Sequence, residues 1–143
     1  MSLSESLHSY FKACPLIDSA GRLNFNYLGA KTTEYTIEEV PETPTIKQYV
    51  SGSSLRQKTF YFGSRESYGE DARIQIGKSG FYEQMAEWVE EQNLKKTFPD
   101  MAAGKRAMKL ECLTDGYLFA SEADTARYQI QLRLTYFQKG ERT

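Results

Sequence analysis

Residues 127–137 read RYQIQLRLTYF, and this stretch decides the class of fold. Polar and apolar side chains alternate from Arg127 to Tyr136, which is the period of a strand with one face against a core. The apolar positions are Tyr128, Ile130, Leu132, Leu134 and Tyr136. The opposite face carries Arg127, Gln129, Gln131, Arg133 and Thr135. The sequence therefore predicts a long strand with one apolar and one polar face.

Shorter strand-like segments precede this one. We expect them at residues 23–27, 32–40, 46–50, 55–63 and 106–113, with turn residues between them. The Ser51–Ser54 cluster predicts a hairpin between the third and fourth of these segments. Residues 117–120, which follow an Asp-Gly turn, are expected to enter a connection before the last strand.

Two helices are predicted. Ser2 and Glu5 have the spacing of a capping box, which starts a first helix that must stop before Pro15. A longer helix is expected to begin after Ser79, with the apolar stripe Phe81, Met85, Trp88 and Val89. Residues 71–76, just before it, fit either a strand or a short helical turn.

The order of these elements predicts an α+β fold for a single domain, residues 1–143. We expect an N-terminal helix and an antiparallel or mixed sheet of about five strands. One main amphipathic helix should pack on one face of that sheet.

Composition narrows the range of functions. The chain has 143 residues, and 18 Lys and Arg against 19 Asp and Glu give a formal net charge of −1 at pH 7. This balance excludes an overall basic field of the kind that holds nucleic acid or an anionic membrane. Aromatic residues make up 13% of the chain, and this excess raises the question of whether some rings serve a partner surface.

Signals for export, metals and catalysis are not found in the sequence. No signal peptide or membrane span is expected, because no basic segment with an apolar run and no ~20-residue apolar stretch occurs. Cys14 and Cys112 are far apart and are expected to be reduced thiols, and His8 is the only histidine. Residues 77–80, Gly-Lys-Ser-Gly, lack the spacing of a phosphate loop. We therefore expect a cytoplasmic protein without metal, cofactor or enzymatic activity.

Seven residues are candidates for contact with a partner. Phe60 and Phe62 share one face of residues 55–63, and neither face of that strand is cleanly apolar. These two rings and Phe137 therefore fit either a core or an interface. The polar stripe of the last strand fits either a solvated face or a surface turned to a lumen or partner. The stripe residues concerned are Arg127, Gln129, Gln131 and Arg133.

Several motifs resemble those of a known family. They are FYFGSRE at 60–66, SGFYEQ at 79–84 and AEWVEEQN at 86–93, with TEYTIE at 33–38, the Pro41 to Pro44 turn and the closing strand 128–137. Together they resemble small proteins from the tail modules of long-tailed bacteriophages and prophages of Gram-positive bacteria. Such proteins are known as minor capsid or tail terminator proteins, and the resemblance spans most of the chain.

This resemblance implies a non-enzymatic subunit that forms a ring, usually a hexamer. The ring would cap the tail tube, stop its polymerisation and offer a docking face to the DNA-filled head. The implied partners are other copies of the chain, the tail tube protein and head–tail connector proteins, and DNA only passes through. The implied locations are the cytoplasm of the bacterial host during assembly and then the head–tail junction of the virion.

Three alternatives stay open from the sequence. A head–tail joining or completion protein would be a similar small ring at the same junction. A stand-alone module could instead use its sheet face to bind a small ligand or peptide. An enzyme is the least favoured, because no nucleophile and base are paired by the spacing of the residues.

Overall fold

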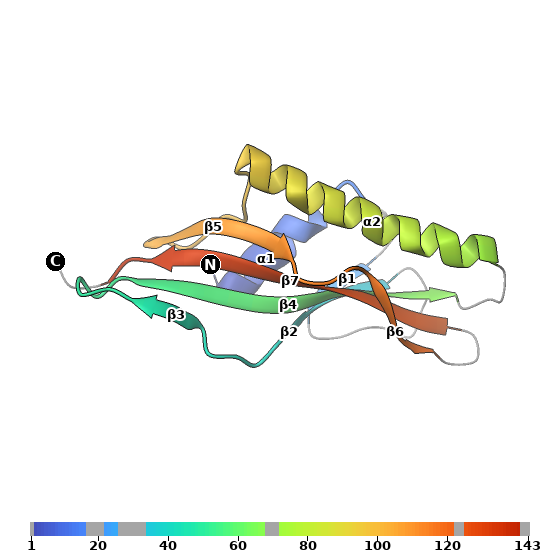
Figure 1. Cartoon of the computed structure of the whole chain (residues 1–143), viewed down its shortest axis with the longest axis horizontal. Coiled ribbons are helices and arrows are strands. Elements are labelled where there is room, and N and C mark those ends of the chain that lie inside the picture. The colour runs from blue at the N-terminus through green and yellow to red at the C-terminus, as the bar shows by residue number, and fades with distance from the viewer. Residues whose placement is uncertain (1, 17–21, 26–33, 68–71, 122–124, 141–143) are drawn as a thin grey trace.

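The computed structural model of the chain describes residues 2–16, 22–25, 34–67, 72–121 and 125–140. Figure 1 shows long strands crossing the molecule and a long helix above them. In chain order the elements are α1 (Leu3–Lys12), β1 (Arg22–Phe25), β2 (Glu34–Glu39), β3 (Thr45–Gln48), β4 (Ser54–Ser67), α2 (Ala72–Lys95), β5 (Lys105–Cys112), β6 (Tyr117–Ser121) and β7 (Thr125–Gln138). The predicted α+β class and the N-terminal helix are confirmed.

Two strands of 14 residues, β4 and β7, form the centre of the sheet. They pair antiparallel from Ser54 opposite Gln138 to Ser67 opposite Thr125. The sheet order is β1-β2-β4-β7-β5, so the sheet is five strands wide, as predicted. It is mixed, because β1 runs parallel to β2 while the other pairs are antiparallel.

Two short strands extend the sheet along its long central strands. β3 pairs with β4 beyond the end of β2, which confirms the predicted hairpin across residues 51–54. β6 pairs with β7 beyond the end of β5. The expectation that residues 117–120 enter a connection is therefore wrong. β5 covers only part of the edge of β7, and the remaining edge offers backbone partners that β6 takes.

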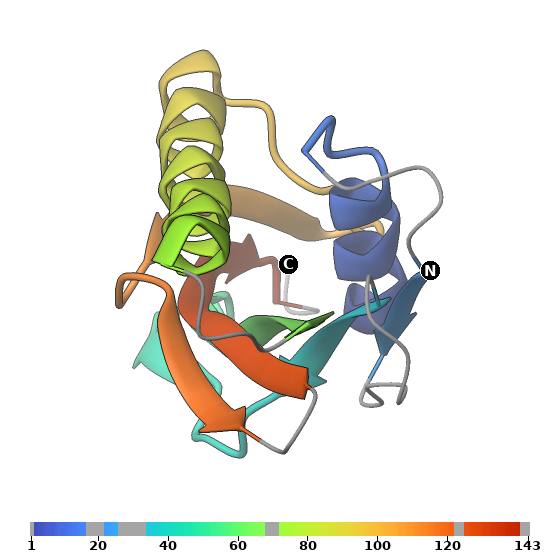
Figure 2. The same ribbon diagram turned by 90° about the vertical axis from the view of Figure 1, so that its right-hand side faces the viewer.

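Both helices lie side by side on the same face of the sheet, as Figure 2 shows. α1 begins as expected, because the Ser2 side chain caps it by accepting a hydrogen bond from the Glu5 backbone N–H at 3.1 Å. α2 begins at Ala72, ahead of the start expected after Ser79. The alternation of Ile74 and Ile76 and two nearby glycines favour other local structures, and tertiary context overrides such weak preferences. Asp71 lies outside the described residues.

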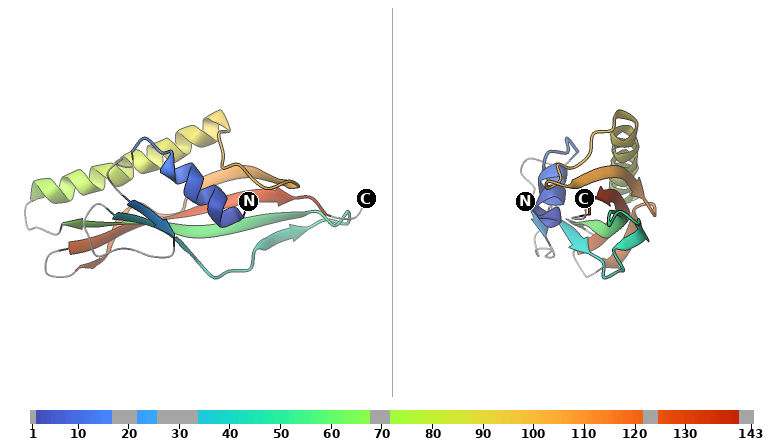
Figure 3. Two further views of the ribbon diagram at one scale, coloured as in Figure 1. Left: turned by 180° about the vertical axis from the view of Figure 1, so that it is seen from behind. Right: turned by 90° about the vertical axis from the view of Figure 1, so that its left-hand side faces the viewer.

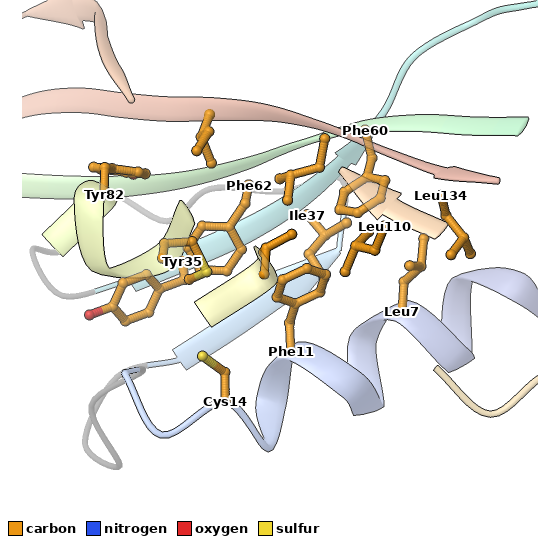
Figure 4. Close-up of a cluster of buried hydrophobic side chains, with 14 of the residues drawn as sticks. Leu7, Phe11, Cys14, Tyr35, Ile37, Phe60, Phe62, Tyr82, Leu110 and Leu134 are labelled. Carbon is orange, nitrogen blue, oxygen red and sulfur yellow. The ribbon is translucent and has the colours of Figure 1, made fainter. Parts of the chain in front are cut away.

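The core fills the space between the helices and the sheet (Figure 4). Phe11 of α1 is its central ring, with centroids 5.7 Å from both Phe60 and Phe62 and 5.9 Å from Trp88 of α2. The predicted apolar face of β7 is confirmed as core, since its three aliphatic side chains are fully buried and its two tyrosines nearly so. The sheet therefore has one face in the core and one face away from the helices.

Candidate functional site

Phe60 and Phe62 are not available to a partner, because both side chains are fully buried in the core. Interface contact was one of the two roles expected for these rings, and the structure corrects it. They belong to the face of β4 that carries Leu132 and Ile130 as cross-strand neighbours, directly beneath the two helices. The same face also carries Arg56 and Lys58, which are only partly buried, and Lys58 Nζ lies 3.6 Å from the Glu39 carboxylate.

The polar stripe of β7 lies on the opposite face, and its first half is occupied by internal contacts. The Arg127 guanidinium forms a two-point ion pair with the Glu38 carboxylate of β2. Arg127 Nε also donates to the Gln129 amide oxygen at 3.1 Å. Gln129 is nearly fully buried and donates to the Tyr117 hydroxyl of β6 at 2.7 Å. These contacts tie β2, β7 and β6 together, so Arg127 and Gln129 act within the chain.

The second half of the stripe is more open. Gln131 lies 3.4 Å from the same Tyr117 hydroxyl, and its backbone N–H donates to the Thr114 hydroxyl at 3.1 Å. Arg133 stands 4.0 Å from the Glu111 carboxylate. Its Nε is the one buried side-chain nitrogen or oxygen without a hydrogen-bond partner among the described residues. The Arg133 side chain as a whole is 36% exposed and Gln131 is partly buried, so solvent reaches part of both residues.

Phe137, the last predicted contact residue, lies at the far end of the sheet and is half-buried. Its ring centroid is 6.3 Å from that of Tyr49, and the Arg106 guanidinium sits over it at 5.7 Å. Lys47 Nζ in turn lies 5.4 Å from the centre of the Tyr49 ring. Two cations therefore flank a pair of rings, an arrangement with favourable cation–π contacts.

Two exposed aliphatic side chains belong to the same β3–β4 hairpin as Tyr49. Val50 is fully exposed in the turn between β3 and β4, and Ile46 on β3 is about half exposed at 49%. We call this group the hairpin end, and it consists of Ile46, Lys47, Tyr49, Val50, Arg106 and Phe137. Isolated exposed aliphatic residues are ordinary, but a gathered patch is typical of an interaction surface. The sequence reasoning missed five of these six residues, because short strand signals do not show which side chains share an end of a sheet.

A cleft of about 380 Å³ opens between the two helices. Its walls come from α1, α2 and the segment after α2, and they are mostly apolar. The principal side chains are Tyr10, Pro15, Trp88, Gln92, Phe98 and Asp100. The Tyr10 hydroxyl donates to the Thr97 carbonyl oxygen at 2.8 Å and fixes that segment against α1. Burial raises the pKa of Tyr10 well above its usual range, so this hydroxyl stays neutral.

The remaining reactive side chains considered in the sequence are the two cysteines and the only histidine. Cys14 and Cys112 are thiols and form no disulfide with each other. Burial, and secondarily the Asp115 carboxylate, raise the pKa of Cys112 to about 11, which keeps it protonated and weakly nucleophilic near neutral pH. The His8 ring Nε2 is 2.8 Å from the Leu23 carbonyl oxygen and joins α1 to β1. Within the described residues, no three His, Cys, Asp or Glu side chains gather in a way that could hold a metal ion.

The described helices include none that combines the length and the apolar character needed to cross a membrane. A scan against protein-family models finds no match for the chain, and no curated protein matches its sequence.

Proposed function

We propose that this chain is a structural subunit that assembles with copies of itself into a ring at the end of a bacteriophage tail tube. In this role it would act as a tail terminator, capping the tube and presenting a face to the head–tail connector. The proposal joins the sequence resemblance of residues 60–66, 79–84 and 86–93 to the surface of the fold.

The observation that carries the proposal is a pair of unlike surfaces on one small domain. The hairpin end is apolar and cationic. The helical layer has a cleft, and exposed glutamates line α2 at positions 83, 87, 90 and 91. A closed ring needs a heterologous interface, in which two different patches of the same chain meet. A subunit with two such patches is suited to that geometry.

Two further features support a non-enzymatic role. The most buried polar residues of the predicted stripe, Arg127 and Gln129, are engaged by Glu38 and Tyr117 within the chain. The near-neutral charge also suits a passage for DNA, because a strongly basic lumen would bind the phosphates.

The test mixes the purified chain with tail-tube subunits and images the tubes by negative-stain electron microscopy. We expect closed rings, usually hexamers, on one end of the tubes, and tubes whose growth stops when the chain is added. A chain that stays monomeric by light scattering, both alone and with tube subunits, and leaves tube growth unchanged would overturn the proposal. Tubes with an unrelated small protein of similar size provide the control.

A further inference from the structure

The turn at the hairpin end is built to hold its apolar side chains outward. The Gly52 N–H donates to the Tyr49 carbonyl oxygen at 3.0 Å, and the Tyr49 N–H donates to the Ser53 carbonyl oxygen at 2.8 Å. Gly52 has a φ of 92°, a left-handed conformation that glycine adopts without a steric penalty. These bonds close a tight turn around Val50, so an exposed aliphatic side chain is fixed at its tip.

The tip projects along the strand direction, beyond the ends of both helices (Figures 1 and 3). It is therefore separated from the cleft between α1 and α2 of its own chain. The Gly140 N–H holds the turn from the other side by donating to the Ser53 hydroxyl at 3.0 Å. An exposed tip that is already rigid loses little conformational entropy when it binds, which favours docking.

The α1–α2 cleft has the size and chemistry to receive such a tip. At about 380 Å³ it is within the range of pockets that take in a small ligand, so two or three side chains fit it. Trp88 and Phe98 provide apolar walls, while Gln92 and Asp100 provide polar groups at the sides. An aliphatic or aromatic side chain that enters the cleft leaves water and gains free energy.

Charge complements shape in this pairing. Lys47 and Arg106 are exposed beside the tip, and neither has an ion-pair partner among the described residues. Asp100, which lines the cleft and is exposed, has the opposite sign. Copies that approach with the tip toward the helical layer are therefore attracted, and two tips repel each other. This asymmetry favours head-to-tail contact over a symmetric dimer.

We propose that the hairpin end of one copy docks in the α1–α2 cleft of the next copy, with Val50 and Tyr49 against Trp88 and Phe98. The inference rests on the proposed function, since it names the two patches that would form the ring. A head-to-tail contact of this kind leaves one tip and one cleft free until the ring closes.

Trp88 provides a direct readout, because it is the only tryptophan of the chain and lines the cleft. We expect its emission to shift to shorter wavelength, and its quenching by acrylamide to fall, as the concentration rises and light scattering detects oligomers. Val50→Asp should move both transitions to at least about tenfold higher concentration, as expected when a buried aliphatic contact is replaced by a charge. Leu94→Asp is the matched control, since Leu94 is also exposed but does not line the cleft, and it should leave both transitions in place.

A second experiment locates the contact where the ring exists, in solution or on tail tubes. Val50→p-benzoylphenylalanine keeps an apolar tip and allows photo-cross-linking, followed by mass spectrometry of the joined peptides. We expect cross-links to residues 6–15 and 88–100 of another copy. Because Val50 is fully exposed, both Val50 variants should melt at the same temperature as the unmodified chain.

The outcomes separate the two proposals. Rings that form with unchanged Trp88 emission, an unchanged Val50→Asp transition or cross-links outside the cleft overturn the docking inference and leave the ring proposal intact. Cross-links from tip to tip, or rings without any cross-link from position 50, also overturn the docking inference. A chain that neither associates nor caps tubes overturns both.

Discussion

Asn93 is the side chain by which α2 holds the edge of the sheet. Its amide oxygen accepts a hydrogen bond from the Leu110 backbone N–H at 2.8 Å, and its amide nitrogen donates to the Leu110 carbonyl oxygen. The same nitrogen lies 3.0 Å from the Val89 carbonyl oxygen. The backbone N–H and carbonyl oxygen of Leu110 thus point away from β7. The Asn93 amide forms the two hydrogen bonds that a neighbouring strand would otherwise form with them.

Asn93→Ala removes the side-chain partners of the Leu110 N–H and of the Leu110 carbonyl oxygen, and Leu110 itself is fully buried. Each polar group left without a partner costs about 1–3 kcal/mol. Both bonds to Leu110 are only partly buried, so water replaces part of what is lost and we expect the lower half of the range for two groups, about 2–4 kcal/mol, in the free energy of unfolding. For a domain of this size that corresponds to a fall of about 5–12 °C in the melting temperature. Urea unfolding followed by circular dichroism measures the first quantity, and calorimetry measures the second. Glu90→Ala, an exposed change on the same helix, should stay within about 0.5 kcal/mol.

Asn93→Asp refines the same argument through its pH dependence. The carboxylate can still accept from the Leu110 N–H, but at pH 7 it has no proton to donate to the Leu110 carbonyl oxygen. The carbonyl oxygens of Leu110 and Val89 face the introduced carboxyl and raise its pKa in the folded state. The loss of stability in this variant is therefore complete above that pKa and becomes smaller as the pH falls below it. An Asn93→Ala loss below about 0.5 kcal/mol, or unchanged hydrogen exchange at the Leu110 amide, would refute the reasoning.

Three other predictions follow from named contacts. Phe62→Ala should cost about 3–5 kcal/mol in urea unfolding, as expected for a fully buried ring, and a near-zero loss would contradict its place in the core. The Tyr82 hydroxyl is 2.6 Å from the Ser64 hydroxyl and donates to the Tyr128 carbonyl oxygen at 2.8 Å. A double-mutant cycle of Tyr82→Phe with Ser64→Ala should therefore give a coupling free energy of about 0.5–1.5 kcal/mol. Additive losses of stability would argue against the bond between the two hydroxyls. Alkylation of Cys112 by iodoacetamide should be slow at pH 7–8 and rise toward pH 11, because burial keeps the thiol protonated, and a rapid reaction at pH 7 would disprove that environment.

The polar stripe of β7 shows how much the alternation of residues along a strand can predict. Alternation alone places Arg127 and Gln129 on the polar face of β7, and this is confirmed. Alternation says nothing about Glu38, which lies 89 residues away in the chain, or about Tyr117 on a strand that was not expected. The pairing of β2, β6 and β7 in the sheet brings these residues together. The first half of the stripe therefore forms hydrogen bonds and an ion pair within the chain.

The same limit applies to the candidate surfaces. The hairpin between β3 and β4 is predicted by its turn residues, but the meeting of Tyr49 with Phe137 depends on the pairing of β4 with β7. The α1–α2 cleft is lined by residues 6–15 and by residues 88–100, two segments that are far apart in the chain. No periodicity within either helix indicates that a gap is left between them.

The sequence by itself determined the α+β class, the capped first helix, the strand hairpin and the two faces of β7. These features depend on interactions between residues close in the chain, such as capping, turn chemistry and alternation, which leave a direct pattern. The tertiary structure alone decided that Phe60 and Phe62 lie in the core, that α2 begins at Ala72 and that residues 117–121 form a strand. In each case the outcome depends on which face or edge another element covers, and that is set by packing between distant segments.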